Sequence, residues 1–233
     1  MATEATLEQQ NLVAENQDWW DGGSNEPFKA SYGKLMMWYF LISDTFTFAA
    51  FLIAYAAARF SNIETWPLAS HVFKSVPGIT DNAPLVFVSI MTFILILSSV
   101  TMVRAVQEGF MMNKWGVVKW LIPTILGGIA FLGCQYLEWS HLIHEGMTLT
   151  NNPFSAVEGQ PGPPQFGMFF YAITGFHGLH VLTGVLLNIW LLVETLKGRF
   201  EKVGHYEMVE KIGLFWHFVD LVWVYVFLAY YLL

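Results

Sequence analysis

The sequence predicts an all-α membrane protein: a polytopic bundle of five transmembrane helices, with the N-terminus inside and the C-terminus outside. Three observations predict this fold class. Hydrophobic residues make up 55% of the 233 residues and charged residues 12%, about half the charged share of a soluble domain. The apolar residues gather in five runs, each long enough for the roughly 20 helical residues that cross a bilayer. Lysine and arginine are concentrated in the loops of one side.

The chain divides into an acidic tail, residues 1–33, and a membrane domain, residues 34–233. The tail carries six acidic residues against Lys29 as its one basic residue, and it lacks apolar periodicity. We expect it to be partly disordered or to lie on a partner. It has neither the basic start and apolar core of a signal peptide nor the acid-poor composition of a transit peptide. No basic patch suits nucleic acid, so no nucleic-acid partner is expected.

Polar loops separate the five runs. The short turn QEGFMMNK joins the second run to the third, and the charged segment KGRFEKVGHYEMVEK joins the fourth to the fifth. The loop NNPFSAVEGQPGPPQ has four prolines and cannot be helical throughout. The predicted spans cover about residues 34–59, 84–106, 116–139, 166–193 and 212–233.

The basic residues predict the orientation of these spans. With five spans, the N-terminus, the second loop and the fourth loop share one side of the membrane. That side carries nine basic residues, namely Lys29, Lys34, Arg104, Lys114, Lys119, Lys197, Arg199, Lys202 and Lys211. The other side carries only Arg59 and Lys74. Cytoplasmic loops are enriched in lysine and arginine, which predicts a cytoplasmic N-terminus. Six tryptophans near span ends fit an interfacial belt: Trp38, Trp115, Trp120, Trp139, Trp190 and Trp216.

Ionisable residues inside the spans form one predicted layer. An ionisable side chain near mid-bilayer costs about 2.5–3.5 kcal/mol on insertion scales, so it normally has a partner. With a rise of about 1.5 Å per residue, each of these side chains lies about 8–14 Å from the inner face of a core about 30 Å thick. The i, i+3 spacing places the two histidines of the fourth span on one face of that helix. It likewise places the histidine and the aspartate of the fifth span on one face of theirs. The layer comprises Asp44, His177, His180, His217 and Asp220.

Three interpretations of this layer remain open from the residues alone. The groups can form interhelical hydrogen bonds that fix the packing. They can handle protons, because histidine titrates near neutral pH and burial raises the pKa of carboxyl groups. They can also bind a metal.

The metal interpretation has one specific motif. Glu138 and His141 form a Glu-x-x-His half-motif of a carboxylate-bridged di-iron site. That site needs a second copy, which the sequence lacks, and the depth estimate puts both residues at the outer interface, far from the layer. Cys134 is the only cysteine, so an intrachain disulfide and a thiolate cluster are both excluded. We therefore expect no metal in this chain and a structural role for Glu138 and His141.

Several motifs resemble subunit III of haem–copper oxidases. FGMFFYAITGFHGLHVLTG and GLFWHFVDLVWVYVFLAYYLL resemble the last two membrane helices of that family. YGKLMMWYFLISDTFTFAAFLIAY resembles the family's helix with a Ser-Glu pair, which is Ser43-Asp44 in this sequence. QYLEW resembles its Gln-Tyr-x-Glu segment, and VQEG matches a short turn motif of the family. The resemblance covers residues 32–233. The chain resembles a five-helix form that lacks the first two helices of the long, seven-helix form, and its membrane acid is aspartate in place of glutamate.

The resemblance implies a non-catalytic subunit of a terminal oxidase in a bacterial plasma membrane, most similar to the cytochrome c type. It implies that haem and copper belong to oxidase subunits I and II, which are the expected partners together with membrane lipids and a larger respiratory supercomplex. It also implies support of proton uptake by the buried layer and allows bound phospholipid. The alternatives are a subunit of a quinol oxidase or nitric oxide reductase, an independent di-iron oxidase, and a transporter. A transporter is disfavoured because the chain shows no internal repeat.

Overall fold

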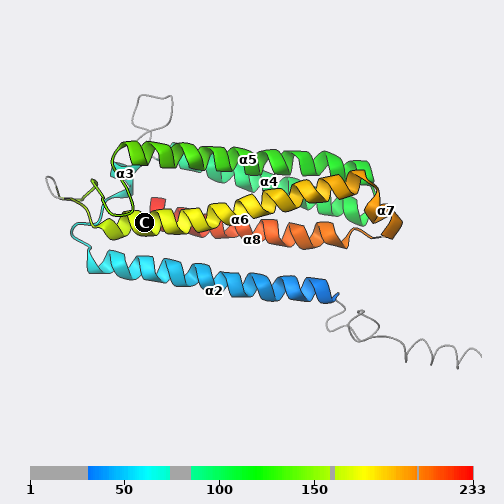
Figure 1. The fold of residues 1–233 in the computed structure, drawn as a ribbon, viewed down its shortest axis with the longest axis horizontal. Coiled ribbons are helices and arrows are strands. Elements are labelled where there is room, and N and C mark those ends of the chain that lie inside the picture. The colour runs from blue at the N-terminus through cyan, green and yellow to red at the C-terminus, as the bar shows by residue number, and fades with distance from the viewer. Residues whose placement is uncertain (1–30, 74–84, 158–160, 204, 233) are drawn as a thin grey trace, which may run out of the picture. The chain divides into compact units, whose positions relative to one another are not determined.

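The computed structural model describes residues 31–73, 85–157, 161–203 and 205–232, and most of them are helical (Figure 1). Residues 1–30 of the acidic tail lie outside the described residues. Five helices are long and apolar enough to cross a membrane. They are α2 (Tyr32–Ser61), α4 (Val86–Phe110), α5 (Lys114–His144), α6 (Pro164–Leu196) and α8 (Glu207–Phe227), which η2 (Leu228–Leu232) continues as a π-helical segment. The predicted all-α class and the five spans are confirmed.

The helix ends follow local sequence signals. Asn113 precedes α5 and accepts a hydrogen bond from the backbone N–H of Gly116, as an N-cap residue does. Gly146 and Gly198 follow α5 and α6 with φ of 91° and 70°, the left-handed conformation that ends many helices. The helix α8 begins five residues before its predicted start, and its first turn carries Glu207 and Glu210. Acidic side chains at that position interact favourably with the helix dipole.

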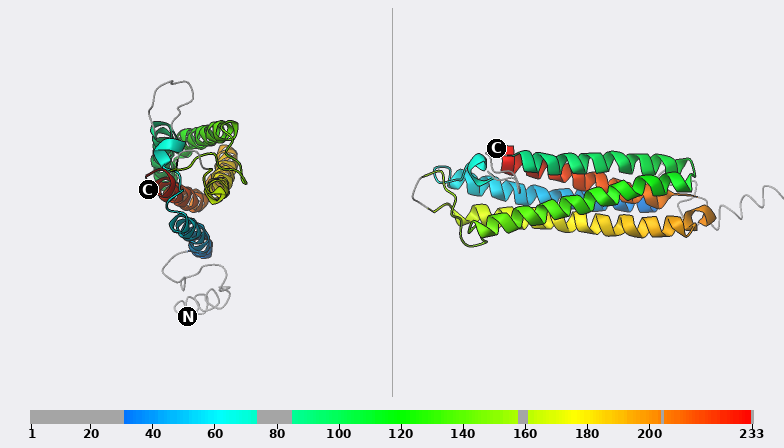
Figure 2. Two further views of the ribbon diagram at one scale, coloured as in Figure 1. Left: turned by 90° about the vertical axis from the view of Figure 1, so that its left-hand side faces the viewer. Right: turned by 90° about the horizontal axis from the view of Figure 1, so that it is seen from above.

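The chain forms two compact units, Met1–Ser43 and Asp44–Leu233, and α2 runs through the boundary between them. The described part of the first unit is the start of α2. In the second unit α4 packs against α5 and α8, and α6 packs against the same two helices. These four helices therefore form a closed ring, which is seen end-on in the left view of Figure 2.

The core of the ring is built around Trp216. Its side chain is 1% exposed, and its indole N–H donates to the hydroxyl of Ser98 on α4 over 3.2 Å. A Cβ added to Gly128 on α5 or to Gly184 on α6 would lie 2.6 or 2.8 Å from the Trp216 ring. The two glycines therefore let α5 and α6 approach the indole closely. The prediction that Trp216 belongs to the interfacial belt is wrong, because α8 starts earlier and carries it into the bundle.

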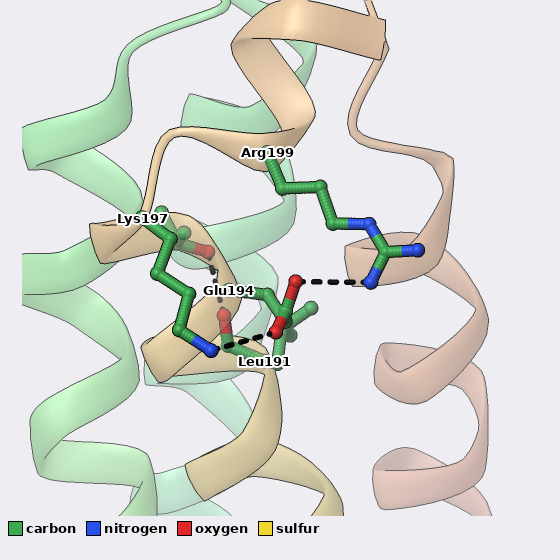
Figure 3. Close-up of polar contacts among 5 residues, drawn as sticks. Leu191, Glu194, Lys197 and Arg199 are labelled. Atoms are coloured by element: carbon green, nitrogen blue, oxygen red, sulfur yellow. Dashed lines mark hydrogen bonds and ion pairs between the residues drawn. The ribbon is translucent and has the colours of Figure 1, made fainter.

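Ion pairs join the segments at one end of the second unit. Figure 3 shows the carboxylate of Glu194 at the end of α6 between two cations from the following turn. Lys197 Nζ lies 3.3 Å and Arg199 Nη1 3.0 Å from its two oxygens. Lys114 at the start of α5 also pairs with Glu201 in the short helix α7 (Arg199–Val203) over 3.7 Å. The second and fourth loops of the membrane domain are thereby held at the same end of the bundle.

Candidate functional site: two polar groups within the membrane helices

The first polar group joins α2 to α6. Oδ2 of Asp44 lies 3.2 Å from Nε2 of His180, and the Asp44 side chain is buried. Apart from this ion-pair contact, Oδ2 has no hydrogen-bond partner among the described residues. The other ring nitrogen of His180, Nδ1, lies 2.8 Å from the backbone carbonyl of Phe176 one turn earlier in α6. In the part of the chain that the structure describes, the ion-pair contact of Asp44 is the one with His180.

These contacts restrict the protonation of the Asp44–His180 pair. The Phe176 carbonyl can only accept, so Nδ1 must carry a proton. The facing Nε2 then bears either a lone pair or a second proton. A neutral His180 requires a protonated Asp44, and an ionised Asp44 requires a doubly protonated His180, because a lone pair facing a carboxylate is repulsive. The contact thus favours one shared proton between the two side chains.

Aromatic rings surround the Asp44–His180 pair. The ring centroids of Phe48, Phe176 and Phe215 lie 5.4, 4.7 and 6.4 Å from that of His180. These rings come from α2, α6 and α8, and they offer the carboxyl and imidazole groups no hydrogen-bonding alternative. The low polarity of this setting strengthens the electrostatic interaction within the pair.

His177 lies one turn before His180 but does not reach Asp44. Its side chain is 0% exposed, and neither ring nitrogen has a hydrogen-bond partner among the described residues. It packs between Phe131 and Trp223, whose ring centroids lie 5.8 and 5.2 Å away. The common helix face predicted for His177 and His180 therefore does not translate into a common partner, and the contacts of His177 are those of a packing residue.

The second polar group lies between α4 and α8. Nδ1 of His217 is 2.6 Å from the hydroxyl of Ser99, and Ser99 is also the hydrogen-bond partner of Asp220. One carboxylate oxygen, Oδ1 of Asp220, is buried and has no hydrogen-bond partner in the described part of the chain. Among the described residues, no hydrogen bond or ion pair links this Ser99–His217–Asp220 group to Asp44 or His180. The single predicted layer is thus two separate groups.

Sequence reasoning did not identify Ser99. The signal was present, because SS at residues 98–99 interrupts an otherwise apolar run. In the structure Ser98 bonds the indole of Trp216 and Ser99 bonds His217. Both serines therefore hold α8 against α4.

Glu138 and His141 lie toward the end of α5 but differ in environment. Glu138 is 6% exposed and accepts a hydrogen bond from the hydroxyl of Tyr231 in η2 over 2.9 Å, with the Gln135 side-chain amide 3.5 Å away. His141 instead lies 3.6 Å from Glu145 on the half-exposed surface. Glu138 is thus buried within the bundle and joins α5 to η2, while its depth at the outer interface of the membrane stays a prediction.

No metal-binding geometry is found in the part of the chain that the structure describes. There, no three His, Cys, Asp or Glu side chains lie close enough together to hold a metal ion. The Glu138–His141 pair in particular gathers no further histidine or carboxylate.

Comparison with known proteins identifies the family. The family model for cytochrome c oxidase subunit III matches residues 22–233. The chain is 32% identical over 201 residues to cytochrome bo(3) ubiquinol oxidase subunit 3 of Pseudomonas putida, covering 85% of this chain and 84% of the relative. It is 31% identical over 209 residues to a probable cytochrome c oxidase subunit 3 of Mycobacterium leprae, covering 89% of each. A cytochrome c oxidase subunit 3 of Synechocystis is 33% identical over 195 residues, covering 83% and 72%.

Proposed function

Because the chain belongs to the cytochrome c oxidase subunit III family, we propose that it is the non-catalytic subunit III of a cytochrome c oxidase, which stabilises subunit I and supports proton uptake in aerobic electron transport. Membership makes the chain a multi-pass membrane subunit of a haem–copper terminal oxidase, of either the cytochrome c or the quinol type. The match over residues 22–233 is the observation that carries the proposal.

The more specific part of the proposal is that the electron donor of the oxidase is cytochrome c and not a quinol. Relatives of both kinds have similar identity, 32% for the ubiquinol oxidase subunit and 31% for the probable cytochrome c oxidase subunit. The GFHGLHV and WHFVD segments favour the cytochrome c type by resemblance. The complex purified through this chain should oxidise reduced cytochrome c. Oxidation of quinol alone would assign the chain to the quinol type, and nitric oxide reduction to the third alternative.

The proton role rests on the Asp44–His180 pair. Its contacts favour one shared proton in apolar surroundings, which is what a proton-holding group needs. The nine basic residues on the side of the N-terminus support a cytoplasmic orientation of that side of a bacterial plasma membrane, with residues 1–33 as a cytoplasmic tail. In that orientation the pair lies in the half of the membrane that protons enter from the cytoplasm.

The cofactors of the oxidase are proposed to reside in subunits I and II. Members of the family generally lack the metal centres of subunit I. The chain purified alone should therefore show no haem spectrum and no stoichiometric iron. Stoichiometric iron that is lost on Glu138→Gln would instead support the independent di-iron oxidase.

Bound phospholipid and a respiratory supercomplex belong to the same proposal. A cavity of about 620 Å³ near the C-terminus supports lipid binding, because its lining is mainly apolar and includes Tyr55, Trp66, Phe166 and Tyr230. An acyl chain fits such a lining. Mass spectrometry of the complex released from mild detergent should detect retained phospholipid, and a Phe166→Glu variant should retain less of it. The same spectra should show subunits I and II and any larger respiratory assembly.

A further inference from the structure

Phe48 lies one helical turn after Asp44 on α2, on the same side of that helix. From Asp44 onward, the buried side chains of α2 are those of Asp44, Phe48 and Tyr55, which form one stripe. The Tyr55 hydroxyl fastens the far part of this stripe by donating to the carbonyl of Ala229 over 3.3 Å. Phe48 lies between this fixed point and the acid, so its packing sets how closely α2 approaches α6 at the level of Asp44.

The ring of Phe48 packs against three side chains of α6. Its centroid lies 5.1 Å from that of Phe176, 6.4 Å from that of His177 and 5.4 Å from that of His180. These separations are typical of specific aromatic packing. The Phe48 side chain is 3% exposed, so its neighbours enclose it. One ring of α2 thus contacts both histidines of α6.

The packing of Phe48 restricts the orientation of the His180 imidazole. The outer torsion of a histidine side chain has a broad, roughly two-fold preference, so neighbouring groups must fix the plane of the ring. The bond from Nδ1 to the Phe176 carbonyl fixes one nitrogen. Phe48 and Phe176 lie against the imidazole at interplanar angles of 65° and 66°. Together these contacts keep Nε2 of His180 directed at Asp44.

Phe48 also separates the Asp44–His180 pair from the buried His177. Neither ring nitrogen of His177 has a hydrogen-bond partner among the described residues, so no hydrogen bond joins His177 to His180 there. The Phe48 ring contacts both imidazoles and offers them neither a donor nor an acceptor. A proton held by the pair therefore has no hydrogen-bonded route to His177 through this contact.

We infer that Phe48 is the positioning residue of the Asp44–His180 pair: it holds the imidazole against the carboxyl and keeps the shared proton from water and from His177. The inference rests on the proposed proton role of the pair and adds the residue that maintains it. Phe48→Ala would leave a cavity beside two imidazoles. A cavity with polar neighbours takes up water, whereas an apolar cavity stays dry. Water in that position would compete with His180 for Asp44 and offer the proton another acceptor.

Phe51 provides a matched control on the same helix. Its ring centroid lies 5.6 Å from that of Phe176 at an interplanar angle of 58°, close to the 5.1 Å and 49° of Phe48. Within the described residues, the ring contact of Phe51 is with Phe176 and with neither histidine. Phe51→Ala therefore removes a similar aromatic contact with α6 and leaves the surroundings of the pair intact.

Double-mutant cycles in different backgrounds test the positioning of His180. The coupling free energy between Asp44 and His180 is measured by unfolding the full chain in detergent, without a further change and with Phe48→Ala or Phe51→Ala. The coupling should fall several-fold with Phe48→Ala and stay unchanged with Phe51→Ala. If the Phe48→Ala chain does not fold, Phe48→Leu and Phe51→Leu replace the alanine variants, since leucine keeps much of the volume and lacks the ring. Equal coupling in the two backgrounds, or no coupling in the unsubstituted chain, would overturn the inference.

The pH profile of the assembled oxidase separates the inference from the proposed proton role. Phe48→Ala should slow turnover several-fold at high pH, where protons are scarce, and Phe51→Ala should not, with haem content unchanged in both. A purely structural loss would lower turnover by the same factor at every pH. That uniform result, or no change, together with a loss at high pH for Asp44→Asn, would overturn the inference. A flat profile for Asp44→Asn as well, with the coupling result intact, would overturn the proton role and leave the positioning of His180 standing.

Discussion

Oδ2 of Asp44 lies 3.2 Å from Nε2 of His180, and Nδ1 of the same imidazole is committed to the carbonyl of Phe176. The first contact joins α2 to α6, and the two contacts together favour one proton shared between the carboxyl and imidazole groups. An acid and a histidine from separate membrane helices thus satisfy each other in apolar surroundings.

Asp44 and His180 should be energetically coupled. Asp44→Ala and His180→Ala each leave the other side chain in the membrane without its partner. The double variant should therefore lose less stability than the sum of the losses in the two single variants. We expect a coupling free energy of about 1–3 kcal/mol from a double-mutant cycle, measured by unfolding in detergent. The control cycle combines Asp44→Ala with Thr183→Ala, since Thr183 bonds only its own helix. Additivity in both cycles would rule out the coupling.

The close approach of α6 to Trp216 should make Gly184 sensitive to the smallest substitution. A Cβ at Gly184 would lie 2.8 Å from the indole, whereas a Cβ at Gly178 in the same helix meets nothing within 4 Å. We expect Gly184→Ala to destabilise the chain by about 1–3 kcal/mol through overpacking. Gly178→Ala should be neutral or slightly stabilising, because alanine favours helix over glycine. Thermal unfolding of both variants in detergent measures the difference, and equal transitions would contradict the packing described here.

The last two tyrosines should respond differently to loss of their hydroxyl groups. Tyr231 donates to the buried Glu138, so Tyr231→Phe leaves a carboxylate oxygen unsatisfied and should cost about 1–3 kcal/mol. The neighbouring Tyr230 hydroxyl is buried and has no hydrogen-bond partner within the described residues. Tyr230→Phe should therefore be neutral or stabilising. The same thermal measurement compares them, and a larger loss for Tyr230→Phe would refute the assigned hydrogen bond.

The membrane helices were predictable from the sequence because their signals are long and local. Apolar runs of bilayer length, a proline-rich loop and charged loops located all five spans. The ends were less accurate: α8 begins at Glu207 and not near residue 212, since charged residues tolerated at a helix start resemble a loop in the sequence. That displacement is also why Trp216, expected at an interface, is buried.

The candidate site was only partly predictable. Depth estimates place Asp44 and His180 at one level, and the structure brings them together. Depth alone does not say which way each helix face points around the ring. His177 therefore packs against Phe131 and Trp223, while His217 and Asp220 turn toward α4. The partner there, Ser99, was missed because a serine in an apolar run carries no charge to attract notice.

The most direct test of the proton role is Asp44→Asn in the assembled oxidase. Asparagine keeps the size of the side chain but cannot exchange a proton with His180. If the pair supports proton uptake, turnover should be slower or inactivation faster at high pH, where protons are scarce, with haem content and subunit composition unchanged. Oxygen consumption by the Asp44→Asn and unsubstituted oxidases across the pH range provides the measurement. Identical turnover and identical inactivation at every pH would contradict the account and leave Asp44 as a purely structural partner of His180.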